Sequence, residues 1–501
     1  MSTSPGSLRL YDTMQREKVA FVPRDAGKAS LYICGPTVQA DPHIGHGRSQ
    51  VVFDTLRRWL QYSGLDVTMA CNITDVDDKI ILRATRERVS SYQIATKYTR
   101  AWNEAMAALN ILPPDIAPTA TGHILEMQAM IQQLLDQDKA YEAEGNVLFR
   151  VRKFPGYGKL SGRKIDDMQA GEDLVATDIK QDPLDFAMWK AAKPGEPFWP
   201  SPWGDGRPGW HIECSAMASK HLGGGFDIHG GGFDLVFPHH ENEITQYEAA
   251  TGNTFANHWV HNGMLTIGEE KMSKSLGNII SLGEAIDQSG PGPLRLWFLS
   301  AHHRSPLVFD DEPVQDAIKT YERFQTFIVT ATATLRSHAE AFGLSVEPFP
   351  LGGVGHEGAV APNTDAATPF LDRFADAMND DLNAPRAVAA LHELVGEGFD
   401  RLKAVDTGDR EAAADVLGLA DALLDVADRV FGLRLGEAVD ATWASAARIA
   451  PVVDDLLVRR AEARAAKDFA AADAIRDQLV ALAVVVEDRP SGSRWYIDPS
   501  S

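Results

Sequence analysis

The N-terminal third of the chain alternates between short apolar runs and stretches in which apolar residues have helical spacing. Residues 31–34 form an apolar run that stops at a Gly-Pro pair, which is typical of a buried strand. Residues 52–60 place apolar side chains three or four positions apart, as on one helix face. Residues 66–72 form a second strand-like run. This β-α-β order predicts a parallel, doubly wound sheet.

The following part of the chain interrupts this pattern. A long helical stretch is predicted over residues 78–109, and the Pro-Pro pair at 113–114 breaks it. Residues 118–206 differ in their pattern and composition, with one predicted helix over 124–137, a predicted hairpin around Gly145 and a Pro/Trp/Gly-rich section. We interpret them as an insertion in the sheet domain. The sheet pattern then resumes at about residue 212 and ends with a strand-like run at 258–267.

Helical, alanine-rich sequence takes over beyond residue 286. Residues 342–368 are rich in Gly and Pro and predict a mobile loop within the helical part. A last helical segment over 452–483 precedes a short strand-like tail at 484–497. The length of 501 residues suggests about three domains.

The composition narrows the possible functions. Hydrophobic residues make up 44% and charged residues 24%, as in globular proteins with a large core. The net charge of −22 argues weakly against a nucleic-acid partner, so an RNA site must be a local basic patch on an acidic body. The sequence has three cysteines, a polar N-terminus and no apolar run long enough to span a bilayer. These features predict a cytoplasmic protein with no membrane partner.

The first motif with candidate chemistry is HIGH at residues 43–46, directly after the first predicted strand. Ligand sites lie at the carboxyl ends of parallel strands, facing a helix N-terminus. Gly45 lets a base or phosphate approach the backbone, and His43 and His46 can donate hydrogen bonds to phosphate oxygens. A polar turn with two solvated histidines is the alternative, and this string alone does not decide between them.

The second motif is KMSKS at residues 271–275, after the run that ends the sheet pattern. Lys271 and Lys274 flank a small flexible segment between two glycines, so the loop can close on a triphosphate and neutralise its leaving group. A charged surface loop is the usual alternative for a lone KxxK. The order and context of the two motifs favour the functional interpretation.

HIGH and KMSKS together are the signature pair of class I aminoacyl-tRNA synthetases, and the sequence resembles that family. The resemblance implies formation of an aminoacyl-adenylate from ATP, with Mg²⁺ expected on the phosphates. It implies that the α-phosphate and the pyrophosphate are stabilised by the catalytic residues His43, His46, Lys271 and Lys274. The implied ATP-binding residues are His43, Gly45, His46 and Lys274.

A third feature is a set of candidate metal ligands. Cys34 ends the first predicted strand, and Cys214 follows much later in the string WHIEC. His239 and Glu243 stand four positions apart, so on a helix they share one face. Thiolate, imidazole and carboxylate are all accepted zinc ligands. Because the sequence has no CxxC pair, two buried free cysteines and an ordinary helix surface stay open as the alternative.

Four longer strings resemble the cysteinyl-tRNA synthetases within class I: CGPTV at 34–38, NITDVDDK at 72–79, WHIEC at 210–214 and FPHHENE at 237–243. The resemblance implies one zinc ion held by Cys34, Cys214, His239 and Glu243. It also implies a cysteine pocket lined by Gly35, Thr74, Trp210, His229 and Asp234. Zinc prefers a soft thiolate, so it can select cysteine over serine without an editing domain. Because catalytic zinc usually keeps an open position, a closed structural zinc is the alternative role.

The last predicted helix carries Arg460, Arg464 and Lys467 at positions i, i+4 and i+7, which predicts a basic stripe on one face. A solvated charged face is the alternative. The strings at 379–385 and 463–473 resemble the helical bundle and the C-terminal anticodon-binding segment of cysteinyl-tRNA synthetases. The resemblance therefore implies that the stripe contacts tRNA, whose unpaired anticodon bases are read by stacking and edge contacts.

We therefore predict an α/β protein with a Rossmann-like, doubly wound parallel-sheet catalytic domain that contains an insertion. An α-helical bundle and a small C-terminal anticodon-binding domain follow it. The expected boundaries are 1–117 and 207–285 for the catalytic halves, 118–206 for the connective insertion, 286–330 for a stem-contact region, 331–445 for the bundle, and 446–501 for the anticodon-binding domain.

The implied activity is ATP-dependent ligation of L-cysteine to tRNA(Cys) through a cysteinyl-adenylate, by a monomer. Two alternatives stay open. One is a mycothiol-type cysteine ligase that acts on a small amino-sugar acceptor, and the other is a non-catalytic zinc- or RNA-binding relative. The helical C-terminal part with its basic stripe argues against the first, and the intact HIGH and KMSKS motifs argue against the second.

Overall fold

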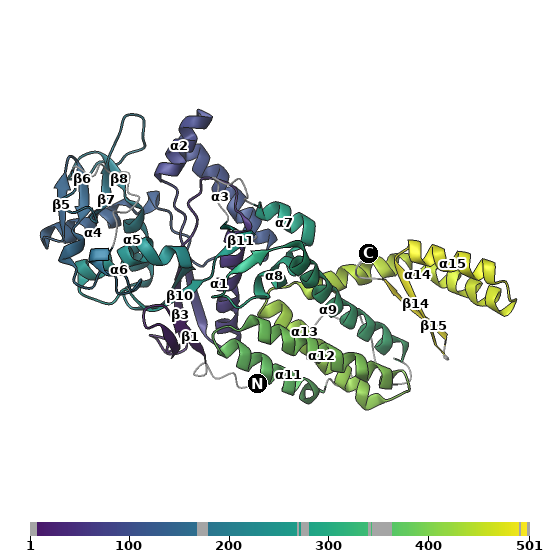
Figure 1. Ribbon diagram of the computed structural model, residues 1–501. Coiled ribbons are helices and arrows are strands. Elements are labelled where there is room, and N and C mark those ends of the chain that lie inside the picture. The colour runs from purple at the N-terminus through teal and green to yellow at the C-terminus, as the bar shows by residue number, and fades with distance from the viewer. Residues whose placement is uncertain are drawn as a thin grey trace. The chain divides into compact units, whose positions relative to one another are not determined.

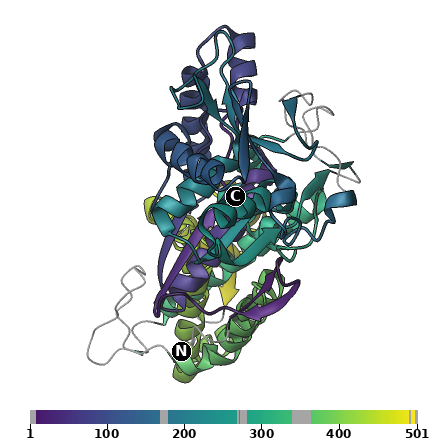
Figure 2. The same cartoon turned by 90° about the vertical axis from the view of Figure 1, so that its left-hand side faces the viewer.

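The computed structural model describes residues 8–167, 179–267, 270–271, 280–338, 342, 363–489 and 492–497. The chain divides into two compact units. The first contains residues 1–288, 301–310 and 378–383, and the second contains residues 289–300, 311–377 and 384–501. The long segment of the first unit is drawn from purple to teal in Figures 1 and 2.

A four-stranded parallel sheet forms the centre of the first unit, with the strand order β10-β9-β3-β4. The chain leaves β3 and reaches β4 through helix α1, whereas β9 pairs with the other edge of β3. This places a topological switch point between β3 and β9, where an open α/β sheet binds its ligand at the carboxyl ends of the strands. The elements are β3 (Lys28–Ile33), α1 (Ile44–Tyr62), β4 (Asp66–Cys71), β9 (Phe226–Gly232) and β10 (Ala256–Asn262). The predicted strand-helix-strand order is confirmed.

Helix α1 is buried along most of its length. Its apolar residues include Val51, Phe53 and Leu56, each with no exposed surface, as expected for a helix that packs on the sheet. Two of its arginines are also buried, Arg48 at 1% and Arg57 at 6% exposed. Charged side chains this deep need hydrogen-bond partners. Arg48 donates to the Met264 and Ser305 carbonyls, whereas Arg57 donates to the Pro113 carbonyl and to the Asp115 carboxylate.

The predicted long helix over 78–109 is wrong in one respect, because it consists of two helices, α2 (Asp78–Glu87) and α3 (Ser91–Ala108). Arg88 ends α2 with a left-handed backbone at a φ of 56°. Ser90 caps α3 and accepts a hydrogen bond from the Gln93 N–H at 3.2 Å. The Ser-x-x-Gln spacing is a capping box that the hydrophobic pattern alone does not reveal.

The insertion contains the predicted hairpin and helix. Strands β5 (Ala140–Ala143) and β6 (Asn146–Phe149) join at Gly145, whose φ is 75°. They continue into an antiparallel sheet with the order β5-β6-β7-β8, which adds β7 (Phe186–Ala191) and β8 (Gly206–Pro208). One buried core joins α4 (Ile124–Asp136), α5 (Trp210–Leu222) and α6 (Glu241–Thr251). The sheet pattern expected from residue 212 therefore begins only at β9, since residue 212 lies in α5.

The strand predicted at 258–267 is broken. Strand β10 ends at Asn262, and β11 (Leu265–Ile267) belongs to a separate sheet with β12 (Glu270–Lys271) and β13 (Leu307–Phe309). Gly263 permits the break, because a Cβ there would lie 2.4 Å from the Ser305 carbonyl oxygen. This part of the chain also contains a hairpin of β1 (Arg9–Asp12) and β2 (Glu17–Ala20) and helix α7 (Leu282–Ser289).

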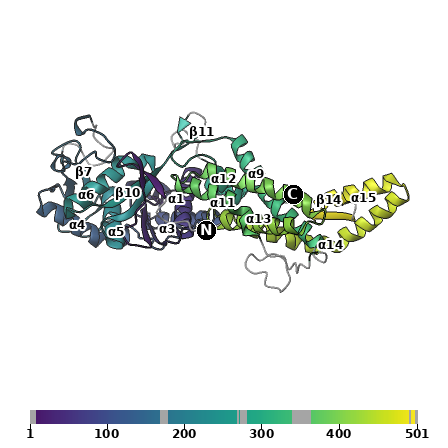
Figure 3. The same ribbon diagram turned by 90° about the horizontal axis from the view of Figure 1, so that it is seen from below.

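The first part of the second unit is a helical bundle in which α9 contacts α8, α12 and α13. Figure 3 labels α9, α12 and α13. Its helices are α8 (Pro291–Leu299), α9 (Asp311–Ser337), α11 (Thr364–Asn379), α12 (Ala384–Val405) and α13 (Arg410–Arg429). Most of the Gly/Pro-rich loop predicted at 342–368 lies outside the described residues. Its last five residues are helical, because α11 begins at Thr364.

The C-terminal part holds α14 (Leu435–Ala465), α15 (Phe469–Ala481) and a hairpin of β14 (Val484–Arg489) and β15 (Gly492–Ile497). The helix predicted over 452–483 is therefore two helices, with Lys467 in the connection at a φ of 60°. A small core of Val453, Leu456, Ile475, Leu479 and Val484 holds the helices and hairpin together. Within the described part of the chain, no helix has the length and apolarity needed to cross a membrane.

Candidate active site

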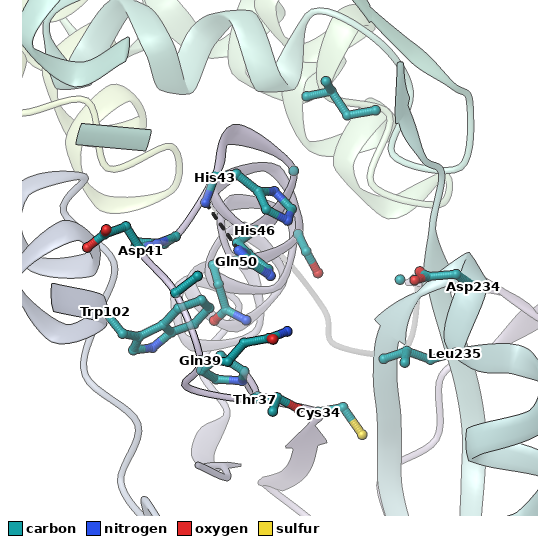
Figure 4. A pocket seen from close by; sticks show the side chains of 18 of the residues that line it. Cys34, Thr37, Gln39, Asp41, His43, His46, Gln50, Trp102, Asp234 and Leu235 are labelled. Carbon is teal, nitrogen blue, oxygen red and sulfur yellow. Dashed lines mark hydrogen bonds between the residues drawn. The ribbon is translucent and has the colours of Figure 1, made fainter. Parts of the chain in front are cut away.

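A pocket of about 680 Å³ opens at the switch point of the parallel sheet (Figure 4). Its walls come from the loop after β3, the start of α1, the segment after β9 and the segment between β10 and β11. These are carboxyl ends of parallel strands, where the sequence predicts the ligand. Of the predicted site residues, those that line the pocket are Cys34, Gly35, His43, Gly45, His46, Trp210 and Asp234.

The HIGH histidines lie at the N-terminus of α1. His43 precedes the helix and His46 lies in its first turn, with the two rings stacked 3.7 Å apart between centroids. The His43 backbone N–H donates to His46 Nδ1 at 3.2 Å. In the neutral ring this leaves the proton on Nε2 of His46, which becomes a hydrogen-bond donor. The helix dipole adds partial positive charge at the same place, so this corner of the pocket is suited to an anion.

The structure describes the side chain of neither KMSKS lysine. The backbone of Lys271 pairs with Thr266 in the β11–β12 ladder, and Lys274 lies outside the described residues. Leu265, the first residue of β11, lines the pocket, so the chain runs from the pocket wall directly toward this motif. The roles of both lysines stay predictions.

The four predicted metal ligands converge below the pocket. The Sγ atoms of Cys34 and Cys214 are 3.8 Å apart, and Cys34 Sγ lies 3.5 Å from Glu243 Oε1. His239 Nε2 lies 2.9 Å from the same Glu243 oxygen. A tetrahedral zinc with Zn–S bonds of about 2.3 Å separates two sulfurs by about 3.8 Å and a sulfur from an oxygen by about 3.6 Å. The donor set and these spacings therefore fit zinc, and of the three pairs measured only the histidine–glutamate pair must widen.

The charges of this cluster are set by burial and by mutual contact. The hydrogen bond from Cys34 lowers the pKa of Cys214 to about 6, against the effect of burial. Burial opposes the charge on Glu243, but His229 and His239 hold its pKa well below the usual value. Burial also opposes the charge on His239, but Glu243 outweighs it and raises the pKa of His239 to about 10. The cluster therefore presents anionic donors to a cation, and a metal must displace the His239 proton.

Other histidines surround the ligands. His211 Nδ1 and His239 Nδ1 are 2.9 Å apart, an interaction that leaves Nε2 of His239 facing the other ligands. His229 Nε2 binds Glu243 Oε2 at 2.7 Å. A second grouping of possible ligands combines Cys34 and Glu243 with His229 and His240. His240 Nε2 lies 3.3 Å from Cys34 Sγ, so either grouping occupies the same buried space.

The predicted cysteine-pocket residues fall into two groups. Gly35, Trp210 and Asp234 line the pocket, and the Trp210 ring stacks on His239 with centroids 4.1 Å apart. Thr74 and His229 are buried outside the lining of the pocket. The Thr74 hydroxyl donates to Glu213 at 2.8 Å, and its backbone N–H donates to the Pro36 carbonyl. Thr74 therefore supports the loop that begins at the predicted ligand Cys34.

Sequence reasoning missed several residues of the site. Ser49 and Asn262 line the pocket and are joined by a hydrogen bond of 2.9 Å. His211 and His240 each stand beside a predicted ligand or pocket residue, so their adjacency in the motifs was a usable signal. Ser49 and Asn262 carried no such signal, because only the fold brings the start of α1 to the end of β10.

The predicted basic stripe is only partly formed. Arg460 donates two hydrogen bonds to Asp488, at 2.7 and 2.9 Å, and Arg464 donates a third at 2.7 Å. Lys467 lies beyond the end of α14, so the helical i, i+7 spacing does not hold. One carboxylate thus neutralises part of the charge, and Arg464, with a side chain 51% exposed, is the more accessible arginine.

Comparison with known proteins assigns the catalytic unit to a class. The family model for the class I (C) tRNA synthetase catalytic domain matches residues 20–319. Among solved structures, Mycobacterium tuberculosis methionyl-tRNA synthetase in complex with methionyl-adenylate aligns with a TM-score of 0.60 at 14% identity, over 83% of this chain and 92% of that one. Agrobacterium radiobacter leucyl-tRNA synthetase, in a ternary complex, aligns with a TM-score of 0.59 at 11% identity, over 84% and 86%. The fold is that of class I aminoacyl-tRNA synthetases.

Family models also match the C-terminal part, the DALR domain at 373–436 and the cysteinyl-tRNA ligase anticodon-binding domain at 447–495. The chain is 46% identical to the cysteine–tRNA ligases of Nitratidesulfovibrio vulgaris and Desulfitobacterium hafniense, over 98% of this chain and all of theirs. It is 45% identical to that of Streptomyces griseus, again over 98% of this chain and all of the relative. The chain belongs to the cysteine–tRNA ligase family.

Proposed function

We propose that this protein joins L-cysteine to tRNA(Cys) in two steps, through a cysteinyl-adenylate. The observation that supports the proposal is that one cavity combines groups suited to phosphate with groups suited to a thiol. The HIGH histidines at the start of α1 form one wall, and Cys34 brings the thiol-rich ligand cluster to another (Figure 4). A protein that activates cysteine needs a phosphate site and a thiol site within the length of one small substrate.

In the first step the cysteine carboxylate attacks the α-phosphorus of ATP, and the bond to pyrophosphate breaks. His43, His46 and the N-terminus of α1 stabilise the negative charge that develops on the phosphate oxygens. Lys271 and Lys274 bind the leaving pyrophosphate, and Mg²⁺ enters bound to the ATP phosphates. Gly45 leaves room for the nucleotide beside the helix, since it has no Cβ.

We propose that Cys34, Cys214, His239 and Glu243 hold one zinc ion. Bound zinc would supply a Lewis acid that binds a thiolate more tightly than the harder hydroxyl of serine. Three of these ligands are at most 1% exposed, whereas Cys34 is half-buried and lines the pocket. This one open side argues for a substrate-facing role over a closed structural site. Trp210 and Asp234 complete the cysteine site, Asp234 as a carboxylate suited to the substrate ammonium group.

In the second step a ribose hydroxyl at the tRNA end attacks the acyl carbon of the adenylate and AMP leaves. The class I resemblance assigns the 2′-hydroxyl. Arg460, Arg464 and Lys467 are proposed to contact the tRNA phosphates, with Arg464 the best placed because of its exposure. The match to an anticodon-binding domain supports a tRNA acceptor over a small amino sugar.

The test is charging of purified total tRNA with labelled cysteine and ATP, with serine as the control. A base-labile, tRNA-linked product that forms with cysteine and not with serine supports the proposal. Cysteine-dependent pyrophosphate exchange without a tRNA product would indicate that the activated cysteine passes to another acceptor. The absence of both tRNA charging and pyrophosphate exchange would indicate a non-catalytic protein.

Two further expectations concern the state of the protein. The three cysteines are free thiols, which suits a reducing, cytoplasmic setting. A monomer is proposed, and sedimentation of the protein without tRNA tests it. The mass of one chain would support the monomer, and the mass of two or more chains would contradict it.

A further inference from the structure

Arg48 is a buried cation whose described partners are both backbone carbonyls. Its Nη1 donates to the Met264 carbonyl at 2.7 Å and its Nη2 donates to the Ser305 carbonyl. The side chain is 1% exposed, and Nε has no hydrogen-bond partner among the described residues. Burying a guanidinium against two neutral acceptors is a poor way to gain stability, because the desolvation cost is large. Stability alone therefore does not explain a buried arginine at this position.

The two carbonyls belong to a connection that forms part of the pocket wall. Met264 lies between β10 and β11 and lines the pocket. Its carbonyl also accepts a hydrogen bond from the Leu307 N–H at 3.0 Å, and the Gly263 N–H donates to the His303 carbonyl at 2.8 Å. The segment before β11 is thus fastened to the loop before β13, and Arg48 fastens both of them to α1.

Arg48 stands two residues after the second HIGH histidine on the same helix. A neighbouring contact acts in the same direction, because the Ser49 hydroxyl donates to the Asn262 side chain at 2.9 Å. Strand β11, which follows the fastened segment, pairs with the backbone of Lys271. One buried side chain therefore links the base of the first signature motif to the strand that leads to the second.

We propose that Arg48 is a positioning residue that sets the distance between the HIGH histidines and the opposite pocket wall at residues 262–265. Adenylate formation needs phosphate-binding groups from both walls in place at once. A misplacement of about 1 Å in such an arrangement costs roughly 100-fold in rate. The cysteine thiol site lies at the end of β3, on α5 and around the start of α6, and the hydrogen bonds of Arg48 among the described residues go to none of these elements.

The proposal therefore predicts a separation of kinetic constants. Arg48→Met removes both donors while keeping an apolar stem of similar length. In cysteine-dependent pyrophosphate exchange, kcat should fall roughly 30- to 100-fold, while KM for cysteine stays within about threefold. Arg48→Lys keeps one donor for the Met264 carbonyl and should recover part of kcat, to within about tenfold of the unchanged protein.

The same helix offers a matched control in Arg57, which is also buried. Arg57 donates to the Pro113 carbonyl at 2.7 Å and to Asp115 at 3.0 Å, and none of these residues lines the pocket. Arg57→Met should lower the thermal midpoint about as much as Arg48→Met but leave kcat nearly unchanged. Zinc content and the melting curve of each variant report whether the protein is folded.

The inference rests on the proposed adenylate-forming activity, which the unchanged protein tests in the same assay. If that protein exchanges pyrophosphate and both methionine variants lose kcat equally, Arg48 has a structural role only. If Arg48→Met melts lower but keeps full kcat, the positioning role is also overturned. Loss of kcat in Arg48→Met alone, with recovery in Arg48→Lys, supports it.

Discussion

Replacing Glu243 with glutamine tests the proposed zinc site most directly. Glu243 has no exposed surface, and each carboxylate oxygen contacts a histidine, Oε2 with His229 at 2.7 Å and Oε1 with His239 at 2.9 Å. The substitution keeps the shape of the side chain but removes its charge. Losing one member of a buried charged set costs about 3–5 kcal/mol, because no water can replace it. We therefore expect zinc affinity to fall at least about 100-fold, or roughly 2.7 kcal/mol.

The assay is zinc affinity, measured by competition with a chromogenic chelator, together with metal content after dialysis. A second readout is the pH dependence of binding. In the metal-free cluster the His239 pKa is raised to about 10 and burial raises the pKa of Cys34. Both must lose protons to bind zinc, so affinity rises with pH by more than tenfold per unit between 6 and 8. Without the Glu243 charge, the pKa of His239 falls and the slope becomes shallower.

Glu241 provides the matched control on the same helix. It is equally buried and accepts backbone N–H bonds from Gly158 at 2.9 Å and Ser161 at 2.8 Å, but it is in neither group of possible ligands. Glu241→Gln should lower stability by about 1–3 kcal/mol and leave zinc affinity unchanged. Full zinc content and unchanged affinity in Glu243→Gln, or equal losses in both variants, would refute the ligand assignment.

Three more outcomes are expected. Gly35→Ala should lower zinc content and abolish cysteine activation, because its Cβ would lie 1.7 Å from the Asn72 carbonyl oxygen and must displace the loop that begins at the Cys34 ligand; retention of zinc with full pyrophosphate exchange would contradict this. Arg464→Ala should raise the KM for tRNA about 3- to 10-fold, without changing pyrophosphate exchange, because it removes one exposed arginine that is proposed to contact a phosphate; equal loss in both assays would assign the arginine to structure. Burial and a neighbouring aspartate raise the pKa of Asp421 to about 6, so the folded state holds its proton more tightly than the unfolded state and loses stability as pH rises through this range. Asp421→Asn should therefore stabilise the protein by about 1–2 kcal/mol at pH 7.5 and by almost nothing at pH 4, as measured by urea unfolding, the partial exposure of the site reducing the full effect.

The sequence predicted the parts of the fold that follow from local pattern. The strands at 31–34 and 66–72 agree with β3 and β4 because buried parallel strands are continuous apolar runs. The helix breaks at Arg88 and Lys467 were missed because left-handed non-glycine residues leave the hydrophobic period almost intact. Hydrophobic periodicity records which face is buried, and it carries little information on where a helix turns.

The candidate site was predicted where one side chain defines the chemistry, and missed where two distant side chains meet. Cysteine, histidine and glutamate in the family motifs pointed to a metal without any knowledge of the fold. The bonds of Arg460 and Arg464 to Asp488 could not be read from a helical stripe, since the carboxylate lies on a strand 24 or more residues away. The positive charge on the proposed tRNA surface is reduced by these bonds to Asp488. Counting the basic residues along the helix therefore overestimates that charge.

The loop after β3 explains how thiol recognition and adenylate chemistry are held in register. It begins at Cys34 and ends at His43, so one short connection carries both a proposed metal ligand and a proposed phosphate-binding residue. The loop is fixed against the chain after β4, because Gly35 N–H donates to the Asn72 side chain at 2.9 Å and Val38 N–H donates to the Thr74 carbonyl at 3.2 Å. A thiol held at one end therefore places the substrate carboxylate at a fixed reach from the other, whereas a serine that binds the metal weakly gains no such placement. Under the proposed zinc assignment, selection at the metal would act on the rate of adenylate formation as well as on binding. A single contact could then provide specificity without a second, editing site.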